Sequence, residues 1–145
     1  MKFAVVILTK NRDVYLKEAL KSACKQKLKP SLIIIIDNAG LAKTKNIVKK
    51  IVPKKQKYFY KPITNINNVA KLRNIASKMV SADYIAFLDD DDYWLPNKLE
   101  TQIEKLESSE YKMTCSEAIA NKGAYEKNKN NKLYNQELMF DEISN

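Results

Sequence analysis

The sequence LIIIIDN, residues 32–38, contains four consecutive isoleucines that end in Asp37 and Asn38. A strand with one face in water alternates apolar and polar residues, and this run has no polar position before Asp37. Both faces of the strand must therefore be covered, which is typical of a parallel sheet packed between helices. Residues 3–9, FAVVILT, predict a second strand of the same kind.

Helical patterns alternate with the apolar strands along the chain. Apolar residues recur at helical spacing in residues 16–24, 47–51, 69–79 and 99–106. Further strands are predicted at residues 57–60, 83–88 and 111–120. We therefore expect an α/β fold, a three-layer sandwich with a mostly parallel central sheet. Residues 1–120 would form this core, and the Asn- and Lys-rich residues from 121 onward begin as a polar loop.

The composition excludes several kinds of catalysis. The chain of 145 residues has no histidine, which removes Ser-His-Asp and Cys-His chemistry and histidine metal sites. Its two glycines, Gly40 and Gly123, exclude a glycine-rich phosphate loop. The net charge of +9 comes almost entirely from scattered lysines, which are more typical of a Lys- and Asn-rich composition than of a nucleic-acid surface. We expect no nucleic-acid partner, whereas small anionic ligands such as nucleotide diphosphates fit the charge.

The cysteines and the apolar runs bear on the compartment. Cys24 falls on the apolar face of a predicted helix and Cys115 in a predicted strand, so we expect both to be core residues in a reducing compartment. No apolar run approaches the ~20 residues of a membrane span. We expect a cytoplasmic protein, or one that is peripheral at the inner face of the membrane.

Four consecutive aspartates at residues 89–92, called the acidic run below, follow an apolar strand directly. Their mutual repulsion requires a compensating charge, and a divalent cation with a phosphate-bearing ligand behind it would supply one. The alternative is a solvated loop or a helix cap, for which Asp92 is suitably placed before Pro96. Trp94, just after the run, indicates a packed segment rather than a free loop.

Polar residues follow the predicted strands at the point where each strand ends. Thr9, Asn11 and Arg12 follow the first strand, Asp37 ends the second, and the acidic run ends a later one. Ligands of open parallel sheets bind beyond the carboxyl ends of the strands. The sequence therefore predicts one site at this edge of the sheet.

Residues 87–100, FLDDDDYWLPNKLE, resemble the D-x-D segment of bacterial GT-A glycosyltransferases of family 2. Residues 5–22, 30–38 and 67–74 resemble that family's first strand and helix, its second strand and its Arg-Asn helix, in the same order and spacing. The resemblance extends over roughly residues 2–107. The resemblance implies a GT-A, Rossmann-like nucleotide-diphospho-sugar transferase fold, with a nucleotide-sugar-binding core at residues 1–120. Residues 121–145 would hold a polar loop and the start of an incomplete acceptor-side region.

The resemblance also implies an activity. An inverting glycosyltransferase would transfer a sugar from a nucleotide-diphosphate donor, most often a UDP-sugar, with Mn²⁺ or Mg²⁺ as cofactor. Thr9, Asn11 and Arg12 would then lie near the base and ribose of the donor. Asp37 would accept a hydrogen bond from the base, and Arg73 would approach the base or the diphosphate.

Within the acidic run, the resemblance divides the roles. Asp91 would ligate the metal together with the diphosphate, and Asp89 would be its partner, in contact with the ribose or a metal-bound water. Asp90 would occupy the variable middle position and point away. The chain departs from the family at Asn38, where a second acid is usual, and at Asn68, where glycine is common.

The catalytic base is the part that the resemblance does not locate. Glu137, Asp141 and Glu142 do not resemble the family's base motif and are interpreted as solvated charges. We therefore expect the donor-binding half of a glycosyltransferase, inactive alone, with an unknown glycan or glycolipid acceptor and an exposed seam that favours self-association. A non-catalytic nucleotide-binding or assembly module, or a nucleotidyltransferase, is the alternative.

Overall fold

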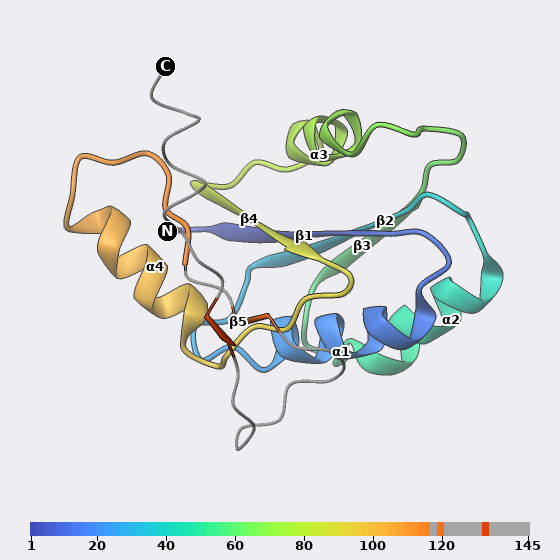
Figure 1. Cartoon of the computed structure of the whole chain (residues 1–145), viewed down its shortest axis with the longest axis horizontal. Helices are drawn as coiled ribbons and strands as arrows, with labels where there is room; N and C mark the ends of the chain where they lie inside the picture. The colour runs from blue at the N-terminus through green and yellow to red at the C-terminus, as the bar shows by residue number, and fades with distance from the viewer. Residues whose placement is uncertain (117–118, 121–131, 134–145) are drawn as a thin grey trace. The chain divides into compact units, whose positions relative to one another are not determined.

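The computed structural model describes residues 1–116, 119–120 and 132–133 (Figure 1). The chain divides into two compact units, Met1–Thr101 and Gln102–Asn145. The first unit ends before the expected core boundary at residue 120 and contains the sheet. In the second unit, β5 (Ile119–Ala120) pairs antiparallel with β6 (Lys132–Leu133). The predicted solvated acids Glu137, Asp141 and Glu142 lie outside the described residues.

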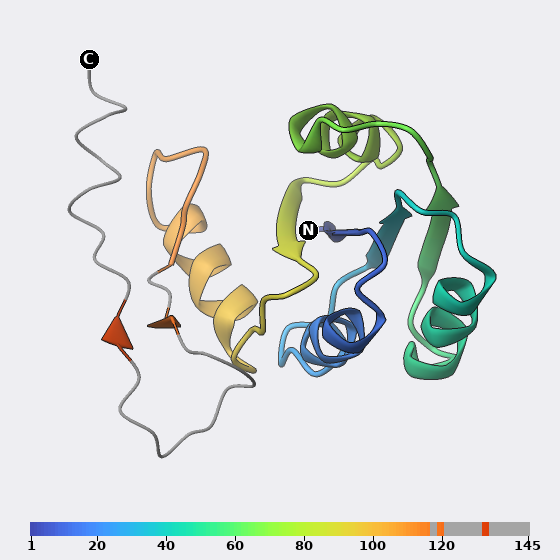
Figure 2. The same ribbon diagram turned by 45° about the vertical axis from the view of Figure 1, so that its right-hand side comes forward.

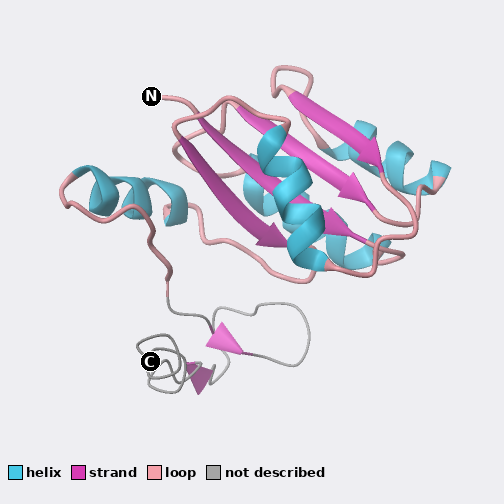
Figure 3. Ribbon diagram, turned by 90° about the horizontal axis from the view of Figure 1, so that it is seen from above, coloured by secondary structure: helices cyan, strands magenta, loops and turns pink. Residues whose placement is uncertain are grey.

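Four parallel strands form the sheet of the first unit, in the order β3-β2-β1-β4. The strands are β1 (Phe3–Thr9), β2 (Leu32–Asp37), β3 (Tyr58–Pro62) and β4 (Tyr84–Asp89). Figure 3 shows the four arrows side by side and pointing the same way, so all four strands end at one edge, called the carboxyl edge below. The strands begin at the opposite edge, the amino edge.

Helices cover both faces of the sheet. The helices in the described part of the chain are α1 (Asp13–Cys24), α2 (Ala42–Ile51), α3 (Val69–Lys78) and α4 (Lys98–Glu107). In Figure 2, α1 and α2 lie on one side of the sheet and α3 on the other. The predicted three-layer α/β sandwich with a parallel sheet is confirmed.

The isoleucine run determines this layering. Ile33, Ile34, Ile35 and Ile36 are all fully buried, as expected for a strand with two covered faces. Ile34 and Ile36 pack with Leu72 and other residues of α3 in one cluster. Because successive side chains point to opposite faces, Ile33 and Ile35 belong to the face that α1 and α2 cover.

The edge strands are less buried than the two central strands. Phe59 of β3 and Phe87 of β4 are 46% and 42% exposed. Within the described residues of the strand predicted at 111–120, β5 is extended in a sheet and residues 111–116 are not. Cys115 is exposed, so its prediction as a core residue is wrong, while Cys24 is half-buried on α1.

None of the described helices combines the length and the apolar composition needed to cross a bilayer.

Candidate functional site

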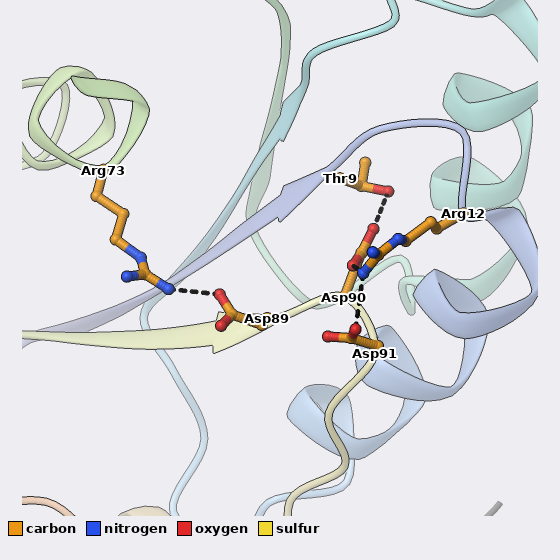
Figure 4. Close-up of polar contacts among 6 residues, drawn as sticks. All are labelled: Thr9, Arg12, Arg73, Asp89, Asp90 and Asp91. Carbon is orange, nitrogen blue, oxygen red and sulfur yellow. Dashed lines mark hydrogen bonds and ion pairs between the residues drawn. The ribbon is translucent and has the colours of Figure 1, made fainter. Parts of the chain in front are cut away.

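The acidic run lies at the carboxyl edge, where β4 ends beside β1 (Figure 4). Two arginines approach it from different elements. Arg73 of α3 donates from Nη2 to Asp89 Oδ1 at 2.6 Å, and Arg12, just before α1, donates from Nη1 to Asp91 Oδ2 at 2.7 Å. In this structure the positive charges of the two arginines therefore offset part of the repulsion between the carboxylates.

Asp90 is the buried member of the run. Its residue is 5% exposed, and its Oδ2 accepts a hydrogen bond of 2.7 Å from the Thr9 hydroxyl at the end of β1. Arg12 Nη1 lies 3.3 Å from Asp90 Oδ1. The register of β1 against β4 brings Thr9 next to Asp90, and the predicted orientation of Asp90 away from the donor stays a prediction.

Burial and charge alter the ionisation of the site. Burial raises the pKa of Asp90, although the Thr9 hydrogen bond and the charge of Arg12 oppose the shift. Partial burial also raises the pKa of Asp92, and the charges of Asp89 and Asp91 raise it further. The pKa of Arg12 is raised by the charges of Asp90 and Asp91, so this guanidinium stays cationic.

Asp89 and Asp91 point to opposite sides of the run, the first toward α3 and the second toward the start of α1 (Figure 4). Within the part of the chain that the structure describes, no three Asp, Glu or Cys side chains converge as a metal site would require. The carboxylate oxygens are nevertheless the hard donors that Mg²⁺ and Mn²⁺ prefer, and Mg²⁺ often takes only one or two of them, completing its shell with phosphate and water. The donor chemistry fits the expected metal, provided that a ligand supplies the other oxygens.

Asp37 is fully buried at the end of β2. Its carboxylate accepts hydrogen bonds from the Ala39 and Leu41 backbone N–H groups at 2.9 and 3.0 Å, and from the Tyr60 hydroxyl at 2.6 Å. Burial and the bond to this carboxylate together raise the pKa of Tyr60. In this structure the hydrogen bonds of Asp37 stabilise the turn before α2. Because Asp37 is fully buried, the expected contact with a nucleotide base would require this turn to rearrange.

Asn38, where the family usually has a second acid, makes a bond that an acid cannot make. Its Nδ2 donates to the Ile66 carbonyl at 2.6 Å, and its Oδ1 lies 3.4 Å from the Ile66 backbone nitrogen. A carboxylate has no N–H to offer this carbonyl. Asn38 thereby ties the end of β2 to the connection that leads into α3 and Arg73.

Asn11 is exposed in the turn between β1 and α1, with a φ of +57°. Asparagine tolerates this left-handed conformation better than most residues. The turn lets the chain reverse, so that Arg12 comes back over the acidic run. Of the residues predicted for the site, Thr9, Arg12, Arg73, Asp89 and Asp91 meet at the carboxyl edge, whereas the Asp37 carboxylate is engaged elsewhere.

Gln26 was not predicted to matter, yet it fixes the segment that follows the acidic run. It is fully buried, donates from Nε2 to the Leu95 carbonyl at 2.8 Å, and accepts at Oε1 from the Leu99 backbone N–H at 3.0 Å. Nearby, Trp94 is 7% exposed, which confirms its predicted packing role. No local pattern marks Gln26, because its partners lie 69 and 73 residues away.

Comparison with known proteins identifies relatives for most of the chain. The sequence profile described as "Glycosyl transferase family 2" matches residues 4–144. The chain is 34% identical over 126 residues to YwdF of Bacillus subtilis, described as an uncharacterized glycosyltransferase, covering 83% of this chain and 44% of YwdF. It is 32% identical over 105 residues to WfaP of Escherichia coli, described as a UDP-Glc:alpha-D-GlcNAc-diphosphoundecaprenol beta-1,3-glucosyltransferase, covering 72% and 41% of the two chains.

The fold also matches a solved structure. The crystal structure of residues 1–349 of Staphylococcus aureus TarS in complex with UDP-GlcNAc superposes with a TM-score of 0.65 at 29% identity. The match covers 74% of this chain and 31% of the TarS chain. The expected GT-A fold is therefore shown, and the chain spans less than half the length of the relatives it matches.

Proposed function

Because this chain belongs to glycosyl transferase family 2, we propose that it binds the nucleotide-diphosphate sugar donor of an inverting glycosyl transfer, with a UDP-sugar as the donor. The TarS structure with UDP-GlcNAc and the UDP-glucose donor named for WfaP support the choice of UDP. The acceptor would be a glycan or glycolipid.

One observation carries the proposal. Two arginines and the acidic run meet at the carboxyl edge, which combines cations that suit a diphosphate with carboxylates that suit a divalent metal. The four carboxylates outnumber the nearby cations Arg12, Arg73 and Lys98, so the site retains a negative excess that a divalent cation would neutralise. A site built only for protein stability would have no need of this excess.

Asp91 is the proposed metal ligand and Asp89 the second, shared with the ribose. Bound there with the diphosphate, Mn²⁺ or Mg²⁺ would neutralise negative charge on the departing nucleotide. Metal binding at Asp91 would require the Arg12–Asp91 ion pair to break, and the Arg12 guanidinium could then bind a diphosphate oxygen. Arg73 would likewise have to break its ion pair with Asp89 before it binds the donor.

The chemical step would be attack of an acceptor hydroxyl on the anomeric carbon, with the nucleoside diphosphate as the leaving group. The two arginines would stabilise the charge that develops on the diphosphate. Thr9 would act indirectly, by holding Asp90 against β1 so that Asp89 and Asp91 are presented on either side. We assign the acceptor's general base to none of the described residues.

Calorimetric titration with UDP, with and without MnCl₂ or MgCl₂, tests the proposal. We expect UDP binding that strengthens with metal, and a loss of at least about tenfold of the metal-dependent part in Asp91→Asn, because one charged ligand is removed. Glu104→Gln, which neutralises an exposed acid of α4, is the control and should bind as the unmodified protein does. Absence of UDP binding under every metal condition would contradict the proposal and favour the assembly module.

Self-association through an exposed seam stays a prediction. Phe87 lies on β4, one of the two outer strands of the sheet, and 42% of its surface is exposed, which supports this prediction. Light scattering at high protein concentration checks it, and a monomer at all concentrations would count against it.

A further inference from the structure

The amino edge of the sheet, opposite the acidic run, carries a dense group of lysines on two connections. One connection links α1 to β2 and the other links α2 to β3. The exposed lysines of these connections are Lys25, Lys27, Lys29, Lys54, Lys55 and Lys57, and Lys49 and Lys50 lie in the last turn of α2. These eight lysines are together called the basic surface below. The two connections lie together, because Gln56 Nε2 donates to the Pro30 carbonyl at 2.9 Å and the Ile33 N–H donates to the Lys57 carbonyl at 3.0 Å.

The charge of the basic surface is not balanced locally. The sequence has no acidic residue between Glu18 and Asp37, and none between Asp37 and Asp83. Across the described part of the chain, no carboxylate oxygen lies within 4.0 Å of any Nζ of the basic surface. Lys29 has a structural role, since its Nζ donates to the Cys24 carbonyl at the end of α1. Helix-terminal carbonyls explain one or two such lysines, but not eight.

A cavity of about 390 Å³ opens within the basic surface. Its polar side chains are Lys29, Ser31, Lys55, Gln56 and Lys57. The Ser31 hydroxyl and the Gln56 amide donate to backbone carbonyls, so the lysine ammonium groups are the donors that suit a phosphate group here. On β3, directly after Lys57, Tyr58 and Phe59 are 37% and 46% exposed.

We propose that the basic surface binds an anionic bilayer, with a lipid phosphate in the cavity. A negatively charged membrane attracts each nearby lysine additively and needs no particular register. Every cation of the surface is a lysine, which acts on a charged bilayer as a point charge and needs no bidentate geometry. Exposed aromatic rings beside the lysines are typical of residues at a membrane interface.

Such binding would orient the protein. The basic surface lies at the amino edge and the acidic run at the carboxyl edge, separated by strands of six or seven residues, or about 20 Å. The donor site would therefore face away from the lipid and stay open to water. This inference does not depend on the proposed transfer reaction.

Vesicle co-sedimentation tests the inference. The chain should bind vesicles that contain phosphatidylglycerol, should not bind pure phosphatidylcholine, and should be released by high salt. Replacing Lys54, Lys55 and Lys57 with Gln should lower the partition coefficient about fivefold per lysine, and so on the order of a hundredfold.

A matched variant separates the basic surface from net charge. Lys45, Lys71 and Lys78 are exposed helical lysines outside the basic surface, and their replacement with Gln gives the same net charge. This variant should keep its partition coefficient within a few-fold of the unmodified protein. Circular dichroism checks the folding of both variants. If the variant at Lys54, Lys55 and Lys57 fails to fold, replacement of Lys25 and Lys27 with Gln tests the basic surface through the connection between α1 and β2.

The outcomes are distinguishable. Equal losses in the two triple variants, or equal binding to neutral and anionic vesicles, would overturn the inference. Tighter binding to a single-stranded oligonucleotide than to vesicles at equal phosphate would overturn it too and assign the surface to nucleic acid. UDP titration of the triple variant should be unchanged, so that failure of donor binding and failure of vesicle binding are read separately.

Discussion

Replacing Thr9 with Val tests how the acidic run is held in place. The variant keeps the shape of the side chain but removes the hydroxyl that donates to Asp90 Oδ2 at 2.7 Å. Both residues are buried, so water does not readily replace the lost donor. A hydrogen bond to a charged group contributes about 1.5–3 kcal/mol, and we expect the free energy of unfolding at pH 7 to fall by that amount. With an m-value of about 2 kcal/mol/M, the urea midpoint would fall by about 1 M.

The pH dependence of this loss has a definite sign. The Thr9 hydrogen bond lowers the pKa of Asp90 against the effect of burial, so it stabilises the ionised carboxylate. Its contribution is therefore present while Asp90 is charged and is lost as the pH falls through the pKa of Asp90. The difference in stability between Thr9→Val and the unmodified protein should shrink in acid.

Thr44→Val is the matched control for Thr9→Val. The Thr44 hydroxyl lies 3.2 Å from Asp13 Oδ1, and Asp13 is also paired with Lys43 at 2.9 Å, so its carboxylate keeps a partner. We expect a loss below about 1 kcal/mol for this control, because its bond is longer than the Thr9 bond and the Asp13 carboxylate keeps Lys43 as a partner. A Thr9→Val variant that loses no more stability than Thr44→Val, or whose loss grows in acid, would refute the reasoning.

Three further changes test other parts of the site. Asp90→Asn removes a carboxylate whose pKa burial raises, so its stability relative to the unmodified protein should increase as the pH rises from 4 to 7; urea midpoints across that range check this, and a constant difference would contradict it. Asn38→Asp places an acceptor against the Ile66 carbonyl and should cost about 1–3 kcal/mol in urea unfolding, whereas an unchanged midpoint would show that the amide bond is dispensable. Gln26→Leu leaves the Leu95 carbonyl without its donor and should cost about 3 kcal/mol, with weaker UDP binding in calorimetry; unchanged stability would contradict the role of Gln26 in fixing the segment after the acidic run.

The sequence was sufficient for the layers and the location of the site. The run from Ile33 to Ile36 has no polar position, and burial of both faces of a strand is possible only between two layers. Parallel strands end at one edge, so polar residues placed after apolar runs converge there. Both conclusions follow from local pattern and the period of a strand.

Only the tertiary structure decided which groups meet at that edge. Thr9 and Asp90 are 81 residues apart, and Arg73 and Asp89 are 16 apart on different elements. Such pairs depend on strand register and helix placement, which no local periodicity encodes. The structure accordingly shows that Asp90 is buried and that the Asp37 carboxylate accepts hydrogen bonds from the turn before α2, neither of which the local sequence indicates.

The acidic run shows the division most clearly. The sequence by itself determined that four adjacent aspartates at a strand end need compensating charge, because like charges repel at any arrangement of the chain. It could not determine the source of that charge. The structure supplies Arg12 and Arg73, brought from the start of α1 and from α3, because packing on both faces of one sheet carries two distant cations to the same edge.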